Sequence, residues 1–381
     1  MTKKIAILYP LFLGGGAESV TLWMLQALID QYDLTLFTFS YIDFAQLDRQ
    51  FGTQLDGAGV HLRIPFKSLK SIRDMQGYSL MTIRQHLLAY YFRNNRMEFD
   101  LAIAAFNEMD LGCRGIQYIH VPLFGHGNEK ARKALRYPTS PIRTLYQRAC
   151  EILAGYSDER MKQNVTLTNS PWTARLIKQS YQIDARVLYP PVSLNAPVVP
   201  WKERENGFIC SGRISPDKNL ESVITILREV RESGHDVHLH ILSGSYDRNY
   251  RKLILELQNQ NSSWLFVEEN LSRTELGQML ASHRYGIHGR ANETFGISVA
   301  EMVKAGCIPF VPSSGGPEEI VDENPNLIFH NNGEAVAKIV NVLSDEKLAG
   351  SLAETMKERA LLFSVDNFKA ELINLVDRMI K

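Results

Sequence analysis

The chain has 381 residues and a mass of 43.3 kDa, with 45% hydrophobic, 22% charged and 9% aromatic residues. This composition is typical of a globular protein and excludes collagen-like, coiled-coil and disordered chains. Because hydrophobic cores stop growing near roughly 250–300 residues, the length predicts two domains. The net charge of zero hides an asymmetry: residues 1–195 carry 22 basic and 16 acidic side chains, which leaves 20 and 26 for residues 196–381.

The basic excess of the first half lies mainly in residues 67–96 and 130–148. Such stretches attract phosphate groups, anionic lipid surfaces or nucleic acid, and an ordinary solvated face is the alternative. The N-terminal run at residues 1–10 is too short to span a membrane and lacks a signal-peptide cleavage pattern, which predicts a cytoplasmic protein.

The cysteines show no CxxC spacing that would suggest a zinc site or a redox pair. We therefore expect buried free thiols at all of them. They are Cys113, Cys150, Cys210 and Cys307.

Strands and helices alternate along the first half. A buried strand at residues 4–9 leads into a glycine loop and an apolar helical pattern that ends near Ile29. Later strands are predicted at 34–39, 101–106 and 117–120. This alternation is the doubly wound α/β pattern.

The second half repeats the pattern after a proline-rich segment at residues 189–206, which is typical of a linker between domains. We expect domains at residues 1–195 and 196–364, with a C-terminal helix at about 365–381 packing back on the first; two such domains would face each other across a cleft. The predicted strands are 207–211, 237–242, 264–267, 285–288 and 308–311, and the predicted helices are 220–232, 296–304 and 346–381.

The loop Gly14-Gly15-Gly16 follows the first strand, where glycines let backbone amides approach a ligand and a helix N-terminus favours an anion. It is not the spaced GxGxxG of a dinucleotide fold, and the second strand lacks the acidic residue that would hold a ribose. A tight turn without a ligand is the alternative.

The stretch SGRISPDKN at residues 211–219 follows a strand and opens a helix, so that it places Arg213 and Lys218 where the strand ends. Arginine can hold phosphate oxygens with two hydrogen bonds and lysine acts as a point charge, so the pair suits a diphosphate without a metal ion. A solvated turn is the alternative.

The stretch HGRANETFGISVAEM at residues 288–302 carries two carboxylates eight positions apart. Because Gly296 disfavours one continuous helix, Glu293 belongs to a loop and Glu301 to the first or second turn of the helix that follows. The helix N-terminal amides can face an anion, and the carboxylates can accept hydrogen bonds from sugar hydroxyls. A surface glutamate is the alternative.

Two further loops follow strands. SSGGPEE at residues 313–319 has the form of a small-residue turn before a helix. In YIHVP at residues 118–122, His120 comes at the end of a strand and Pro122 forces the chain out of regular structure. A lone histidine is more often structural, but the carboxyl end of a strand is where ligands bind in this class of fold.

In their order along nearly the whole chain, these segments, with TNSPWTA (168–174) and LYPPV (188–192), resemble glycosyltransferase family four. The similarity is closest to the branch that includes the lipid-linked-oligosaccharide α-1,2-mannosyltransferases. The resemblance implies a GT-B fold, with the sugar nucleotide held mainly by the C-terminal domain and the acceptor by the N-terminal one. It also implies retaining, metal-independent transfer assisted by the departing phosphate.

By this resemblance, Arg213 and Lys218 bind the diphosphate, Glu293 meets the donor sugar and Glu301 holds the ribose. His120 would lie beside the reacting sugar, and the glycine loop would approach the donor phosphate. The catalytic set is His120, Glu293, Arg213 and Lys218, and the substrate-binding set is Gly15, Gly16, Arg213, Lys218, His288, Glu293, Phe295, Gly296, Ile297 and Glu301.

The expected partners are a sugar nucleotide, with GDP-mannose favoured, a lipid-linked or polysaccharide acceptor, and an anionic membrane surface at which a cytoplasmic protein would be peripheral. No cofactor, metal or nucleic acid is expected, and the chain has no Asp-x-Asp. Thr294 stands where the branch often has histidine, so UDP-glucose or another UDP-sugar remains open. A phosphorylase or epimerase, and an inactive sugar-nucleotide-binding partner subunit, are the alternatives.

Overall fold

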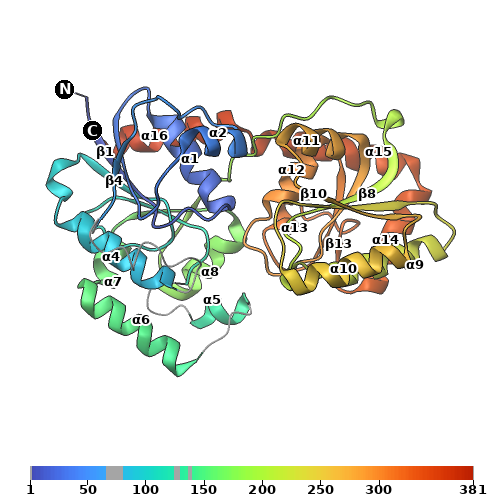
Figure 1. Ribbon diagram of the computed structural model, residues 1–381, viewed down its shortest axis with the longest axis horizontal. Helices are drawn as coiled ribbons and strands as arrows, with labels where there is room; N and C mark the ends of the chain where they lie inside the picture. Colours follow the sequence, from blue (N-terminus) through green and yellow to red (C-terminus); the bar gives the residue numbers. More distant parts are fainter. Residues whose placement is uncertain (1, 66–79, 124–128, 136–139, 381) are drawn as a thin grey trace. The chain divides into compact units, whose positions relative to one another are not determined.

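The computed structural model describes residues 2–65, 80–123, 129–135 and 140–380. The chain divides into two compact units (Figure 1). Unit 1 comprises residues 1–191 together with 365–381, and unit 2 comprises residues 192–364. Each unit contains its own parallel sheet with helices packed on it.

Among the described residues, the sheet of unit 1 has seven parallel strands in the order β3-β2-β1-β4-β5-β6-β7. They are β1 Lys4–Leu8, β2 Asp33–Phe37, β3 His61–Arg63, β4 Leu101–Ala104, β5 Ile116–Ile119, β6 Val165–Thr168 and β7 Arg186–Val187. The α-helices are α1 Gly16–Leu28, α2 Phe44–Phe51, α4 Met81–Arg93, α5 Glu129–Ala134, α6 Pro141–Ala154, α7 Asp158–Lys162, α8 Pro171–Tyr181 and α16 Val365–Ile380.

Both faces of this sheet are buried. Its strands therefore carry apolar residues at consecutive positions, as strands covered on two sides do. On one face, Ile5 and Ile7 of β1 pack in a cluster with α1 and with Leu372 of α16. On the other face, Leu8 packs in a cluster with Phe92 of α4. Helix α16 thereby belongs to the core of unit 1, although it follows unit 2 in the chain.

The sheet of unit 2 has six parallel strands in the order β10-β9-β8-β11-β12-β13. They are β8 Glu205–Ser211, β9 His238–Ser243, β10 Leu265–Glu269, β11 His283–Ile287, β12 Ile308–Pro312 and β13 Ile328–Phe329. The α-helices are α9 Leu220–Glu232, α10 Arg248–Gln260, α11 Arg273–Ser282, α12 Ile297–Ala305, α13 Pro317–Ile320, α14 Asn332–Ser344 and α15 Glu346–Leu362.

The predicted elements and the observed ones agree in type and differ at their ends. The short strands β3, β6, β7 and β13 were not predicted. The predicted helix at 346–381 is two helices, because the chain breaks at Phe363, which is fully buried. Unit 2 begins at Val192, whose amide donates to the carbonyl of Phe363 (2.9 Å) and whose carbonyl accepts a hydrogen bond from the ammonium of Lys304 (2.5 Å).

The expectation that all four cysteines are buried is wrong for Cys113, which is exposed in the loop between β4 and β5. The two basic stretches do not form continuous exposed basic surfaces, because some of their arginines are buried. Arg84 is fully buried, and Arg132 is buried with its guanidinium donating to the carbonyl of Leu123 at 2.9 Å. Residues 66–79, which include part of the first stretch, lie outside the described residues.

Candidate functional site

Three loops of unit 2 meet at the carboxyl edge of its sheet. Because β8, β11 and β12 are parallel neighbours, the loops that follow them leave the same edge. The loop after β8 carries Arg213 and Lys218, the loop after β11 carries His288 and Glu293, and the loop after β12 carries Ser314 to Gly316. The fold therefore brings together motifs that are about 75 to 100 positions apart in the sequence.

Glu293 lies at the centre of this edge and binds two partners. The ammonium of Lys218 lies 3.2 and 3.1 Å from its two carboxylate oxygens. The Nε2 of His288 lies 2.6 Å from Oε2. Because His288 is 1% exposed and the other two side chains are mostly buried, the three groups form a connected, largely dehydrated cluster.

The charges of this cluster are fixed by its surroundings. Burial alone would raise the pKa of Glu293, but the charge of Lys218 and the hydrogen bond from His288 hold that pKa well below its usual range. Burial lowers the pKa of His288, so its neutral ring donates Nε2–H to the carboxylate. Glu293 is thus an ionised acceptor held in one orientation.

Arg213 lies at the same edge but is far more accessible. Its side chain is 55% exposed, and its nearest acidic partner, Asp217, is 3.7 Å away. Asp217 is bound more closely by Arg290, at 2.8 Å, from the loop that carries Glu293. An exposed guanidinium with a weakly held partner is free to turn toward an anion.

The loop after β12 fixes the backbone around Glu293. The amide of Gly316 donates to the carbonyl of Glu293 at 2.8 Å. Gly315 has φ +148°, and a Cβ there would lie 2.8 Å from the same carbonyl oxygen. Only glycine, which has no side chain, allows this close approach of the two backbones. This explains why glycines occupy positions 315 and 316.

Helix α12 begins directly after Gly296, whose φ of +98° is the left-handed conformation that glycine adopts readily. The first amides of a helix have no partner within the helix. Ile297 therefore starts a group of amides at the edge that carries Glu293. The ring of Phe295 is 3% exposed and packs against Phe363, so only its backbone is available there.

Glu301 lies in the second turn of α12, as predicted, but it has a protein partner. The guanidinium of Arg273, the first residue of α11, donates to its Oε1 at 2.8 Å. The same guanidinium also donates to the carbonyl of Ser193. Sequence reasoning missed Arg273, because nothing near it in the sequence links it to Glu301.

In unit 1, His120 follows β5 at the carboxyl edge of that sheet. It is buried, and its Nε2–H donates to the carbonyl of Ala105 at 3.1 Å. Asn107 accepts a hydrogen bond from the His120 backbone amide at 2.9 Å. Burial lowers the pKa of His120 to about 4, so the ring is neutral with Nδ1 as an acceptor.

The glycine loop of unit 1 is organised by Glu18. Gly15 is the N-cap of α1, followed by Gly16 as the first helical residue. The buried carboxylate of Glu18 accepts hydrogen bonds from the backbone amides of Leu13 and Gly14, the latter at 2.7 Å. Glu18 therefore fixes the loop, while a Cβ on Gly15 would have nothing within 4 Å.

The structure thus brings together Lys218, His288 and Glu293 of the predicted residues, with Arg213 in a loop at the same edge. Glu301 is bound by Arg273 instead. Gly15, Gly16 and His120 belong to unit 1. Sequence reasoning missed Asp217 and Arg290, although both lie inside stretches that it singled out. Within the described residues, side chains that could hold a metal ion gather at the opposite, amino edge of the unit 2 sheet.

Comparison with known families identifies the C-terminal half. Residues 194–360 match the family model described as "Glycosyl transferases group 1". This range covers β8 to β13 and therefore every loop at the carboxyl edge of unit 2.

Curated relatives are named GDP-Man:Man(3)GlcNAc(2)-PP-Dol alpha-1,2-mannosyltransferase. The Dictyostelium discoideum protein is 23% identical over 260 residues, which is 62% of this chain and 50% of that protein. The human protein is 22% identical over 308 residues, which is 71% of this chain and 62% of that protein. The chain spans about half the length of the curated relatives it matches.

Solved structures are similar over the whole chain. Anabaena Alr3699/HepE, in complex with UDP and glucose, has a TM-score of 0.68 at 15% identity and covers 99% of this chain and 100% of that one. WaaG, a glycosyltransferase involved in lipopolysaccharide biosynthesis, has a TM-score of 0.67 at 13% identity, covering 98% and 99%. The predicted GT-B fold is confirmed. The whole chain thus has the GT-B fold, and its C-terminal unit is similar to the group 1 glycosyl transferases.

Proposed function

We propose that this protein is a retaining, metal-independent hexosyltransferase, with mannose from GDP-mannose as the favoured donor and a lipid-linked or polysaccharide precursor as acceptor. The observation that carries the proposal is the cluster of Lys218, Glu293 and His288 beside Arg213 and the first amides of α12. It offers cations and amides to a diphosphate and an ionised carboxylate to sugar hydroxyls. The names of the curated relatives favour GDP-mannose.

In this proposal, the charge that develops on the departing diphosphate is stabilised by Arg213, by Lys218 and by the first amides of α12. Such electrostatic stabilisation, with positioning of the two substrates, supplies the main catalytic effect. Glu293 orients the donor sugar by accepting hydrogen bonds from its hydroxyls. Glu301 gives up its hydrogen bond with Arg273 and binds the ribose instead. His120, neutral at pH 7, offers Nδ1 to a hydroxyl of the reacting sugar.

A UDP-sugar is the second candidate donor. Thr294 departs from the histidine expected in the mannosyltransferase branch, and one of the similar structures contains UDP and glucose. A sugar-nucleotide-binding partner subunit without activity is the third candidate. These candidates differ in which nucleotide they bind and in whether a product forms.

Calorimetric titration of the purified chain with GDP, UDP and their mannose, glucose and N-acetylglucosamine derivatives tests the proposal. We expect tight GDP-mannose binding that is unchanged by EDTA. Preference for a UDP-sugar would keep the site and change the donor. Absence of any sugar-nucleotide binding would contradict the proposal.

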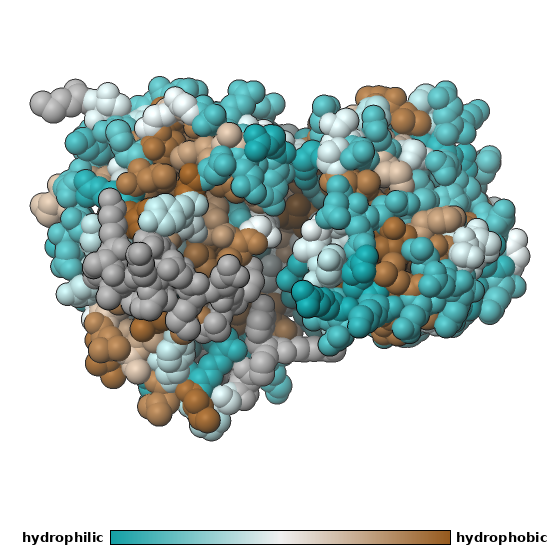
Figure 2. All heavy atoms as spheres, in the orientation of Figure 1, coloured by the Kyte–Doolittle hydropathy of each residue, from teal (hydrophilic) through white to brown (hydrophobic). Residues whose placement is uncertain are grey.

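We further propose that helix α6 of unit 1 docks on an anionic membrane surface. The described residues contain no helix long and apolar enough to cross a membrane. Exposed apolar side chains nevertheless gather on α6, in the part of Figure 2 where Figure 1 labels that helix. They are Ile142 (81% exposed), Leu145 (70%), Ile152 (80%) and Leu153 (72%).

The same helix carries the exposed cations Arg143 and Arg148. An amphipathic helix of this kind lies in the headgroup region with its apolar side chains inserted. Each basic residue near an anionic surface contributes about 1 kcal/mol of attraction. Apolar insertion and charge attraction therefore act together on α6, and an acceptor embedded in a membrane would be brought to unit 1.

The double substitution Leu145→Ser and Ile152→Ser is expected to weaken binding to vesicles that contain anionic lipid by at least about tenfold, because each side chain contributes roughly 1.5–3 kcal/mol when buried. Co-sedimentation with such vesicles measures the effect. Val198→Ser, at an exposed valine of unit 2, is the matched control and should bind as before. Equal binding by the double variant would refute the docking role of α6.

A further inference from the structure

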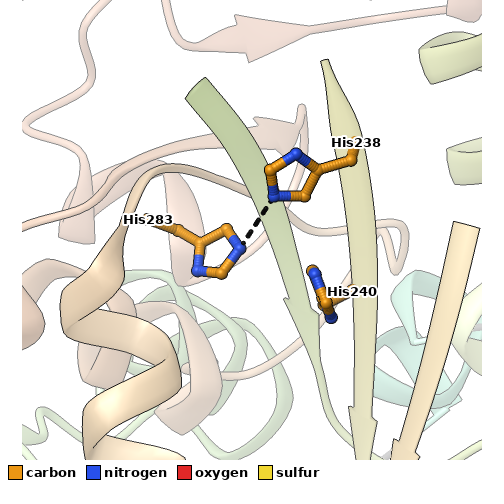
Figure 3. A group of neighbouring side chains, drawn as sticks. All are labelled: His238, His240 and His283. Carbon is orange, nitrogen blue, oxygen red and sulfur yellow. Dashed lines mark hydrogen bonds between the residues drawn. The ribbon is translucent and has the colours of Figure 1, made fainter. Parts of the chain in front are cut away.

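Three histidines meet on one face of the unit 2 sheet, at its amino edge (Figure 3). His238 and His240 are the first and third residues of β9, and His283 is the first residue of β11. Alternate residues of a strand point to the same face, which explains why His238 and His240 lie together. One potential ligand atom from each of the three residues lies within 4.8 Å of the other two.

The intervening strand leaves room for the rings. Strand β8 lies between β9 and β11 in the sheet, with Gly207 paired to His238. A Cβ on Gly207 would lie 2.2 Å from Nε2 of His238, so no other residue fits beneath this ring as it is placed. Gly207 therefore lets side chains from two non-adjacent strands approach each other over β8.

The centroids of the three rings are spaced like those of imidazoles bound to one tetrahedral ion. These centroids are 5.3 Å apart for His238 and His240, 5.0 Å for His240 and His283, and 5.1 Å for His238 and His283, with interplanar angles of 71° to 86°. Zinc–nitrogen bonds of about 2.05 Å at tetrahedral angles place imidazole centroids roughly 5.2 Å apart. Packing alone does not require the three centroid distances to be nearly equal.

Hydrogen bonds outside the cluster fix the direction of His283. Its Nδ1–H donates to the carbonyl of Met279 at 2.8 Å, which leaves Nε2 as the lone-pair nitrogen, 3.0 Å from Nε2 of His238. A histidine that ligates a metal typically donates its other ring nitrogen to a carbonyl in this way.

Carboxylates lie beside all three rings. Oε2 of Glu205, the first residue of β8, is 3.4 Å from Nε2 of His238 and 4.0 Å from Nε2 of His283. Oε1 of Glu268 is 3.4 Å from Nδ1 of His240, a buried nitrogen that makes no hydrogen bond within the described residues.

From this geometry we propose that His238, His240 and His283 form a binding site for a divalent transition metal ion, zinc in particular, with Glu205 as the fourth ligand. Ligand atoms of a tetrahedral zinc ion lie about 3.3 Å apart. The separations among His238, His283 and Glu205 are 3.0, 3.4 and 4.0 Å, and the ligand atom of His240 lies within 4.8 Å of those of the other two histidines, so that its ring would turn inward on binding. Three imidazoles and one carboxylate suit zinc. The ion can enter from solvent, because the side chains of His238 and Glu205 are 25% and 56% exposed.

This ion would be structural. Strand β8 has seven residues, so its two ends are roughly 20 Å apart. Glu205 is at its amino end, whereas the loop with Arg213 and Lys218 follows its carboxyl end. The ion would join β8, β9 and β11 and would take no part in binding a diphosphate. The proposal is therefore independent of the proposed transferase activity.

The test uses the full chain without a polyhistidine tag, dialysed against a chelator and then freed of it. Titration with Zn²⁺ in competition with a chromophoric chelator measures affinity and stoichiometry. Replacement by Co²⁺ reports the geometry through its visible absorption. We expect about one zinc ion per chain, an intense tetrahedral Co²⁺ spectrum and a higher melting temperature with Zn²⁺.

His238→Gln is expected to weaken Zn²⁺ binding by at least roughly 100-fold, since loss of a ligand costs more than loss of a residue that only orients one. His330→Gln, at an exposed histidine after β13, is the control and should bind Zn²⁺ like the unaltered chain. A chain that binds no Zn²⁺, a weak octahedral Co²⁺ spectrum, or equal binding by His238→Gln would overturn the proposal. The three rings would then be joined by hydrogen bonding and packing alone.

Discussion

Replacement of Glu293 by glutamine is expected to lower kcat/KM for sugar transfer by roughly 100-fold to 1000-fold, the usual effect of removing one preorganised electrostatic contact. Glutamine keeps the size of the side chain but removes its negative charge. That charge pairs with Lys218 (3.1 Å), and the carboxylate accepts a hydrogen bond from His288 (2.6 Å). Release of nucleoside diphosphate, with the donor identified by calorimetry, measures the effect.

The same substitution should also lower the free energy of unfolding, by about 3 kcal/mol or more, because it leaves Lys218 mostly buried without its counter-charge. The sign of the pH dependence follows from the pKa of Glu293, which the folded protein depresses. Stabilisation by such a carboxylate is complete above its unfolded pKa of about 4.3 and is lost as the pH falls toward the folded value. Urea unfolding should therefore separate the two proteins most at neutral pH and less in acid.

The control for this substitution is Glu269→Gln. Glu269 also binds an arginine, Arg251, at 2.6 Å, but this pair is more exposed, and Glu269 is the last residue of the edge strand β10. For Glu269→Gln we expect the free energy of unfolding to change by less than about 1 kcal/mol and the rate of sugar transfer to stay the same. If Glu293→Gln transferred sugar as fast as the unaltered chain, Glu293 would have no role in the reaction.

Arg213→Ala is expected to lower kcat/KM by at least roughly 100-fold without changing the free energy of unfolding. The guanidinium is 55% exposed and its nearest acidic group is 3.7 Å away, so the folded chain loses little when it is removed. A diphosphate would lose a partner able to form two parallel hydrogen bonds. Steady-state kinetics, calorimetry with the nucleotide diphosphate and urea unfolding distinguish the two effects.

Two further variants sharpen this result. Arg213→Lys keeps the charge but not the planar pair of donors, and its activity should fall between those of the alanine variant and the unaltered chain. Arg228→Ala, on helix α9 of the same unit, removes a cation away from the carboxyl edge and should leave both binding and transfer unchanged. Full activity in Arg213→Ala would remove Arg213 from the site.

Local sequence signals predicted the main strands of both units. The strands at 4–8 and 308–312 are runs of apolar residues because helices cover both faces of the sheet, and such runs are visible in the sequence alone. Strands β3, β7 and β13 have only two or three residues, which is too few for a periodic signal. β6 has four residues, but its threonines alternate with apolar positions and give no continuous run.

The candidate site was predicted in part for the same reason. Glycines, cations and carboxylates placed directly after apolar strands marked the loops that contain Arg213, Lys218, His288 and Glu293. Which of these side chains bind each other was not predictable, because the pairing depends on which strands are neighbours in the sheet. Strands β8 and β11 are neighbours in the sheet although β9 and β10 lie between them in the chain.

The sequence by itself therefore determined that the chain forms two α/β domains and where the loops with chemical groups lie, because both follow from local hydrophobic patterns and residue types. The tertiary structure alone decided that Lys218 meets Glu293 across 75 positions, that Arg273 binds Glu301, and that Gly207 leaves space for three histidines. Such contacts arise from the packing of whole elements, since parallel strands bring distant segments to one edge regardless of their separation in sequence.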